Sequence, residues 1–366
     1  MRTMFLAASA ALALSLPASA QDASPSSSEA VGQTKTPAPA PSEIVAAAPA
    51  ADWVAIPAED LLVMTLAPDA DGSPRTVVIQ LMPAPFSQGW VHNIRLFARA
   101  KWYDGISVNR VQDNYVTQWG DPNYDNPEAT GTPKPLPEGL KVMGEDEYLA
   151  GITYGRWVAD ATSQSGWRRT SRSENNKLSR FNFIENAEGD RYAKHTQFFG
   201  GWPLAWELAP LLADAPRVPR SSVAEVWPTH CYGMVGVGRN YSPDTGSGAE
   251  LYTVIGHAPR HLDRNIALVG RVIEGMQHLS SLPRGSGALG FYTAEEAAKR
   301  TPILSVRVVS DLAPSEQPSF EYLSTTSDTF AAYAEAIANR RDPFFIVPAG
   351  GADICNIRVP VRRVAE

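Results

Sequence analysis

The chain has 366 residues, of which 44% are hydrophobic, a composition typical of a globular protein with enough apolar material for a core. Its formal net charge of −7 argues against nucleic acid as a partner. Beyond the N-terminus no apolar run approaches the length of about 18 residues that a spanning helix needs, so we expect no membrane span.

Residues 1–20 have the three parts of a secretory signal peptide. Arg2 gives a positive start, Phe5–Leu16 is a short apolar stretch, and Ala18-Ser19-Ala20 predicts cleavage after Ala20. The small residues of this segment are typical of bacterial export and predict a periplasmic location. Residues 21–51 are rich in Ala, Pro and Ser, and we expect a disordered tether because they bury too little apolar surface to offset the entropy of ordering.

Strand-like runs open the folded region, and one amphipathic helix lies among them. The helix is predicted over Asn93–Lys101, where Ile94, Phe97 and Ala98 recur at helical spacing. The runs of β-branched and aliphatic residues predict strands. These strands are Asp60–Leu66, Thr76–Leu81, Ile106–Val111 and Asn114–Trp119.

The regular pattern stops after Asp121 and returns near His230. Residues 122–228 hold many prolines and glycines, which predicts a long irregular insertion. The strands expected downstream are His230–Val237, Ala249–Ile255, Ile266–Val272, Thr301–Leu312, Phe344–Val347 and Ile354–Val361. Helices are expected at Glu274–Leu279 and at Ser327–Arg341, the second with a Ser/Asp N-cap signal.

These elements predict a mostly β fold, a closed antiparallel β-barrel capped by helices. We expect one domain over residues 52–312, interrupted by the insertion at 122–228, and a C-terminal extension over residues 313–366. The sequence does not indicate an oligomeric state.

Other kinds of chemistry find little support in the sequence. His257 and His261 have ligand spacing, but Pro259 between them and the absence of a third ligand nearby disfavour zinc. We expect no metal and no cofactor. Cys231 and Cys355 either pair in an oxidising compartment or stay separate as buried thiols, and the sequence leaves both open.

Four segments carry motifs in a fixed order along the chain: His92–Asp121, His230–Gly238, Ser247–Thr253 and Leu262–Met276. In this order they resemble the cyclophilin-type peptidylprolyl isomerases. The run from His92 to Asp121 is similar to the family's helix, its Tyr-Asp-Gly turn and its two following strands. The three later segments match family motifs in the right order. The resemblance implies a cyclophilin-like barrel that binds proline-containing polypeptide clients.

The resemblance also assigns roles by position. Arg110 corresponds to the catalytic arginine, and Gln118 to the glutamine that helps to orient it. The other matching positions are Tyr115, Val116, Tyr252 and Leu262 in the proline pocket, and Val235 and Glu250 in the peptide groove. No covalent chemistry is needed, because a donor that favours the twisted amide lowers the barrier of about 18–20 kcal/mol to rotation.

Several positions depart from the family pattern. They are Tyr115 and Tyr252 in place of Phe, Val116 in place of Met, Gly236 in place of Asn, Asn109 and Ile266 in place of His, and Trp119 in place of Gly. Two hypotheses therefore stay open. The chain is an exported isomerase, or it is a catalytically weak or inactive peptide-binding or chaperone module on the same fold.

Overall fold

The computed structural model describes residues 37–124, 129–153, 190–208 and 223–364. The expected signal peptide and the first part of the expected tether lie outside these residues. Within them, no helix is long and apolar enough to cross a membrane.

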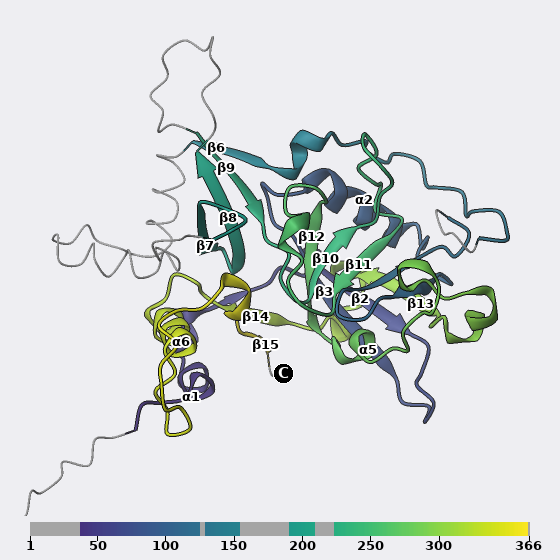
Figure 1. Cartoon of the computed structure of the whole chain (residues 1–366). Helices are drawn as coiled ribbons and strands as arrows, with labels where there is room; N and C mark the ends of the chain where they lie inside the picture. The colour runs from purple at the N-terminus through teal and green to yellow at the C-terminus, as the bar shows by residue number, and fades with distance from the viewer. Residues whose placement is uncertain (1–36, 125–128, 154–189, 209–222, 365–366) are drawn as a thin grey trace, which may run out of the picture. The chain divides into compact units, whose positions relative to one another are not determined.

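Eight antiparallel strands form one sheet that nearly closes on itself (Figure 1). In sheet order they are β13 (Ile303–Val308), β2 (Leu61–Leu66), β3 (Arg75–Leu81), β12 (Leu268–Glu274), β10 (Met234–Val237), β11 (Leu251–Val254), β5 (Val116–Gly120) and β4 (Ser107–Val111). Backbone hydrogen bonds from Ile303 to Ile106 and from Val108 to Thr301 join β4 to the segment that enters β13. The predicted mostly β barrel is thus confirmed.

Helix α2 (Gln88–Arg99) covers the apolar interior of the barrel with one buried face. The buried face carries Trp90, Val91, Ile94 and Phe97, all fully buried. These residues recur three or four positions apart, as the apolar face of an amphipathic helix requires. The helix begins five residues before the expected Asn93, because Trp90 and Val91 extend the same face. A short helix, α5 (Gln277–Ser280), follows β12.

The insertion contains a regular sheet, which corrects the expectation of an irregular segment. Its strands, in order, are β6 (Ala150–Thr153), β9 (Val223–Pro228), β8 (Trp202–Leu208) and β7 (His195–Phe199). Leu204 and Val226 pack into the main core. Sequence reasoning missed β8 and β9 because Pro203 and Pro228, which resemble strand breakers, lie within them near their ends.

The C-terminal extension forms a second small sheet with the segment that precedes the barrel. Strand β14 (Phe320–Leu323) lies between β1 (Trp53–Ala55) and β15 (Val361–Arg363). Helix α6 (Asp328–Ala338) lies near the predicted position, and the Ser327 hydroxyl accepts a hydrogen bond from the Phe330 N–H, as the N-cap signal predicts. The strand expected at Phe344–Val347 is wrong, because these residues form an exposed turn.

The expected tether ends earlier than residue 51. Helix α1 (Pro41–Ala46) packs against α6, and Ile44 and Val45 contact the apolar cluster around Phe330. Two aliphatic side chains are sufficient to order this Ala- and Pro-rich segment because they pack on a complementary apolar surface. That surface comes from residues almost 300 positions away in the sequence.

Cys231 and Cys355 form a disulfide, which resolves the alternative that the sequence left open. Their Cα atoms are 4.9 Å apart, and the bond links the segment before β10 to the C-terminal extension across a sequence separation of 124 residues.

Candidate functional site

Seven of the eight residues with roles implied by the resemblance line one cavity of about 730 Å³, which we call the Arg110 cavity. The seven are Arg110, Tyr115, Val116, Gln118, Glu250, Tyr252 and Leu262. They come from β4, β5, β11 and the loops that flank them, so sheet pairing brings together residues that are up to 152 positions apart.

The Arg110 side chain is held in place over this cavity by three acceptors. Its Nε donates to the Leu289 carbonyl oxygen at 2.7 Å and its Nη1 donates to Gln118 Oε1 at 3.1 Å. Its Nη2 donates to Gln112 Oε1. These three contacts hold the guanidinium at the cavity instead of leaving it free on a solvated strand face.

Two aromatic rings flank the Arg110 guanidinium. Its Cζ lies 5.7 Å from the centroid of Tyr115 and 5.5 Å from that of Phe291. Burial lowers the pKa of Arg110, while Tyr115 and Glu250 act in the opposite direction. Because the ordinary pKa of arginine is above 12, the group stays charged at neutral pH. A partly desolvated cation acts more strongly on nearby dipoles than one in water.

The side-chain amide of Gln118 links the Arg110 guanidinium to the Glu250 carboxylate. Its Nε2 donates to Glu250 Oε2 at 2.7 Å, while its Oε1 accepts from Arg110. The amide therefore has one consistent orientation between a cation and a carboxylate. Gln118 and Glu250 are both buried, so this chain of hydrogen bonds is shielded from solvent.

An apolar pocket lies beside the guanidinium. Val116 and Tyr252 form a buried cluster with Val254, and Tyr115 and Ile266 pack against it. Antiparallel pairing of β11 with β5 sets Tyr252 directly opposite Gln118. One part of the cavity is thus apolar, while Arg110, Gln118 and Glu250 supply polar groups beside it and Arg239 and Asn240 supply polar groups from the loop after β10.

The Tyr252 hydroxyl and Gly236 form a matched pair. A Cβ added at Gly236 would overlap the Tyr252 hydroxyl and ring, so the tyrosine occupies the space that a side chain at position 236 would need. Positions 236 and 252 are therefore coupled, since a side chain at position 236 requires the Tyr252 ring to move.

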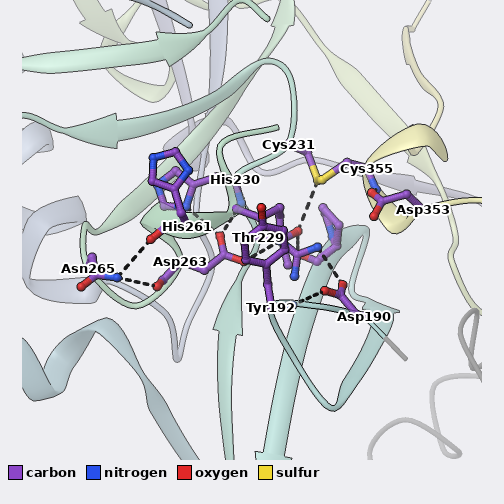
Figure 2. A network of polar contacts seen from close by, with 12 residues as sticks. Asp190, Tyr192, Thr229, His230, Cys231, His261, Asp263, Asn265, Asp353 and Cys355 are labelled. Atoms are coloured by element: carbon purple, nitrogen blue, oxygen red, sulfur yellow. Dashed lines mark hydrogen bonds and ion pairs between the residues drawn. A yellow bond between two sulfur atoms is a disulfide. The ribbon is translucent and has the colours of Figure 1, made fainter. Parts of the chain in front are cut away.

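A buried polar chain leads away from Tyr252. Its hydroxyl lies 2.9 Å from His230 Nε2, and His230 Nδ1 lies 2.9 Å from Asp263 Oδ1. Asp263 also accepts from Arg260, which donates to Asp190 of the insertion (Figure 2). Burial lowers the pKa of His230, although the Asp263 hydrogen bond opposes this. The neutral imidazole donates from Nδ1 and accepts the Tyr252 hydroxyl at Nε2.

Val235 does not line the Arg110 cavity, and its expected role in the peptide groove stays a prediction. Its side chain is 1% exposed and packs in the barrel core. Successive side chains along a strand point to opposite faces of the sheet. Gly236 faces Tyr252 on the cavity side, so its neighbours Val235 and Val237 point into the core.

Two other departures prove to be structural. Trp119 is 1% exposed and fills the barrel core. Asn109 accepts from the Ser107 hydroxyl at 2.6 Å and donates to the Gly120 carbonyl oxygen at 3.0 Å, which joins β4 to β5 beside a register shift.

Leu289 and Phe291 also line the cavity, as do residues 238–241, and sequence reasoning gave none of them a role. Leu289 and Phe291 lie about 180 positions after Arg110, in a segment without a family motif or a strand pattern. Among the described residues, no three His, Cys, Asp or Glu side chains lie close enough together to hold a metal ion. His257 instead contacts the Asn114 side chain at 2.9 Å.

Comparisons with known proteins agree with this arrangement. Residues 76–308 match the family model described as cyclophilin type peptidyl-prolyl cis-trans isomerase/CLD. Among solved structures, the chain is similar to the crystal structure of cyclophilin AquaCyp293 from Hirschia baltica, with a TM-score of 0.54 and 20% sequence identity over 85% of this chain and 93% of that chain. At this identity the likeness shows the fold alone. No curated protein matches the sequence.

Proposed function

The chain belongs to the cyclophilin-type peptidyl-prolyl isomerase family, and on this premise we propose that it isomerises X–Pro bonds of exported proteins with Arg110 as the catalytic residue. The observation that carries the proposal is the geometry of Arg110, whose cation is fixed beside an apolar pocket. Neither a metal nor a cofactor takes part in the proposed reaction.

In this mechanism the cavity supports the twisted amide without forming a covalent bond. The proline ring enters the pocket of Tyr115, Val116, Tyr252 and Leu262 and covers their apolar surface. Among the described residues, acceptors engage three of the five guanidinium N–H groups of Arg110, which leaves two for the client. Rotation breaks amide resonance, and a fixed donor stabilises the charge distribution of the twisted state.

The proposed location is the periplasm. Its support is the signal-like sequence of residues 1–20, and the Cys231–Cys355 disulfide is compatible with an oxidising compartment.

A second candidate function is binding of proline peptides without efficient catalysis. It is favoured by Gly236, which lacks the side chain that the family uses to bond the client backbone. The two candidates share the pocket and differ in what Arg110 does.

A protease-coupled isomerisation assay on an Ala-Ala-Pro-Phe tetrapeptide separates them. We expect Arg110→Ala to lower kcat/KM about 10²-fold, in the range found when one transition-state donor is removed. Arg75→Ala is the matched control, because Arg75 also donates to a backbone carbonyl oxygen but does not line the Arg110 cavity. No acceleration above the uncatalysed rate with either wild type or Arg110→Ala, alongside measurable peptide binding, would favour the binding module.

A further inference from the structure

The segment from Gly285 to Tyr292 lies along the outer edge of β4. Gly285 donates to the Val111 carbonyl oxygen at 3.1 Å and Tyr292 to that of Asn109 at 3.0 Å, and Phe291 pairs with Arg110 across a β-bridge. This segment therefore forms one wall of the Arg110 cavity, and its attachment to β4 is through backbone hydrogen bonds.

Leu289 has an unusual conformation at the tip of this segment. Its φ of 57° is left-handed, which costs a non-glycine residue about 1–2 kcal/mol, and its carbonyl oxygen accepts the Arg110 Nε. Its side chain is 66% exposed and lines the cavity. The hydrogen bond between the Leu289 carbonyl oxygen and Arg110 accounts for the turn, but any residue could supply it. It does not account for a large apolar side chain at this exposed position.

A second exposed apolar side chain lines the same cavity from another segment. Tyr241 is 93% exposed and lies in the loop that follows β10. The sheet order is β10-β11-β5-β4, so Tyr241 and Leu289 belong to the two ends of a run of four strands. Because the Leu289 segment lies outside β4, four strand spacings, about 19 Å along the sheet, separate it from β10. In an extended peptide the Cα atoms two positions before and two positions after a central residue are about 14 Å apart, and their side chains extend the reach toward both ends.

We propose that Tyr241 and Leu289 select clients in which bulky apolar residues flank the proline, about two positions to either side. The selectivity follows from the hydrophobic effect, because an apolar client side chain would bury the exposed apolar surfaces of Tyr241 and Leu289. This inference rests on the proposed function for the place where the proline binds.

The test uses hexapeptides with Leu or Ser two positions before and two positions after the proline, and NMR exchange spectroscopy to measure cis–trans rates. For wild type we expect kcat/KM to be about tenfold or more higher for the Leu peptide than for the Ser peptide. Leu289→Gly should reduce this ratio about fivefold. Glycine accepts a positive φ and keeps the backbone carbonyl, so folding is retained.

Leu304→Ser is the control, because Leu304 is 50% exposed on β13 and does not line the cavity. It should leave the ratio as in wild type. A ratio in Leu289→Gly equal to that of wild type overturns the inference. If no peptide is isomerised, the proposed function fails by itself. The affinities of the same peptides then decide the inference: a Leu preference that Leu289→Gly weakens supports it, and equal affinities overturn it.

Discussion

Gly236→Ala tests the steric coupling between position 236 and Tyr252. A Cβ at position 236 would approach the Tyr252 ring and hydroxyl well inside 3.0 Å, a separation that real Cβ contacts essentially never show. The ring must therefore move by roughly 1 Å to restore ordinary contact. Because both residues lie in a packed strand pair, the ring cannot move without disturbing its neighbours.

The expected cost has two parts. Overpacking in a core costs about 1–3 kcal/mol, and loss of the 2.9 Å contact between Tyr252 and His230 leaves a buried imidazole nitrogen without its donor, at about 1–3 kcal/mol. Together they lower the free energy of unfolding by roughly 2–6 kcal/mol, which corresponds to a fall in Tm of about 5–15 °C. A displaced ring also narrows the proline pocket, so kcat/KM should fall at least about tenfold.

Thermal denaturation and the isomerisation assay measure the two effects separately. Gly351→Ala is the control, since a Cβ at Gly351 meets no atom within 4 Å. Gly236→Ala combined with Tyr252→Leu should regain part of the lost Tm, because leucine lacks the outer ring atoms, without regaining activity. A Tm and a kcat/KM for Gly236→Ala equal to those of the control would refute the reasoning.

Two further predictions concern stability. Cys355→Ser should lower the free energy of unfolding by up to about 4–5 kcal/mol, the chain-entropy value for a crosslink across 124 residues, and urea denaturation with and without reductant should then coincide for the variant. Because the pKa of His230 is lowered in the folded state, His230 binds a proton more readily in the unfolded state than in the folded state. Protonation therefore favours unfolding, and the protein loses stability as pH falls below about 6.5. His230→Gln should therefore lose less stability than wild type between pH 7 and pH 5, measured by denaturation at each pH; equal losses would contradict this.

The barrel and most of the cavity were predictable from sequence because their signals are local. Alternating apolar runs identified the barrel strands, and unbroken spacing between Arg110, Gln118 and the family motifs identified seven cavity residues. Val235 does not line the cavity, because one residue of register reverses which face a strand residue occupies. A motif match gives the position in the sequence, whereas the pleat decides the direction of the side chain.

The parts that sequence reasoning missed depend on long-range packing. Packing against α6 stabilises helix α1. The burial of His230 is understood only from its hydrogen-bond partners Tyr252 and Asp263. The Leu289 wall has no periodic pattern, because its hydrogen bonds are made to β4 rather than within the segment. In each case the partner that explains the residue is distant in sequence.

The central claim is that the Arg110 cation accelerates rotation about an X–Pro bond. NMR exchange spectroscopy on a proline peptide, with a catalytic amount of protein, measures that rotation without a coupled protease. Wild type should produce cis–trans exchange peaks within the mixing time, and Arg110→Ala should lose them while it still shifts the peptide resonances at higher protein concentration. Equal exchange with both proteins, or none with wild type despite binding, would contradict the account.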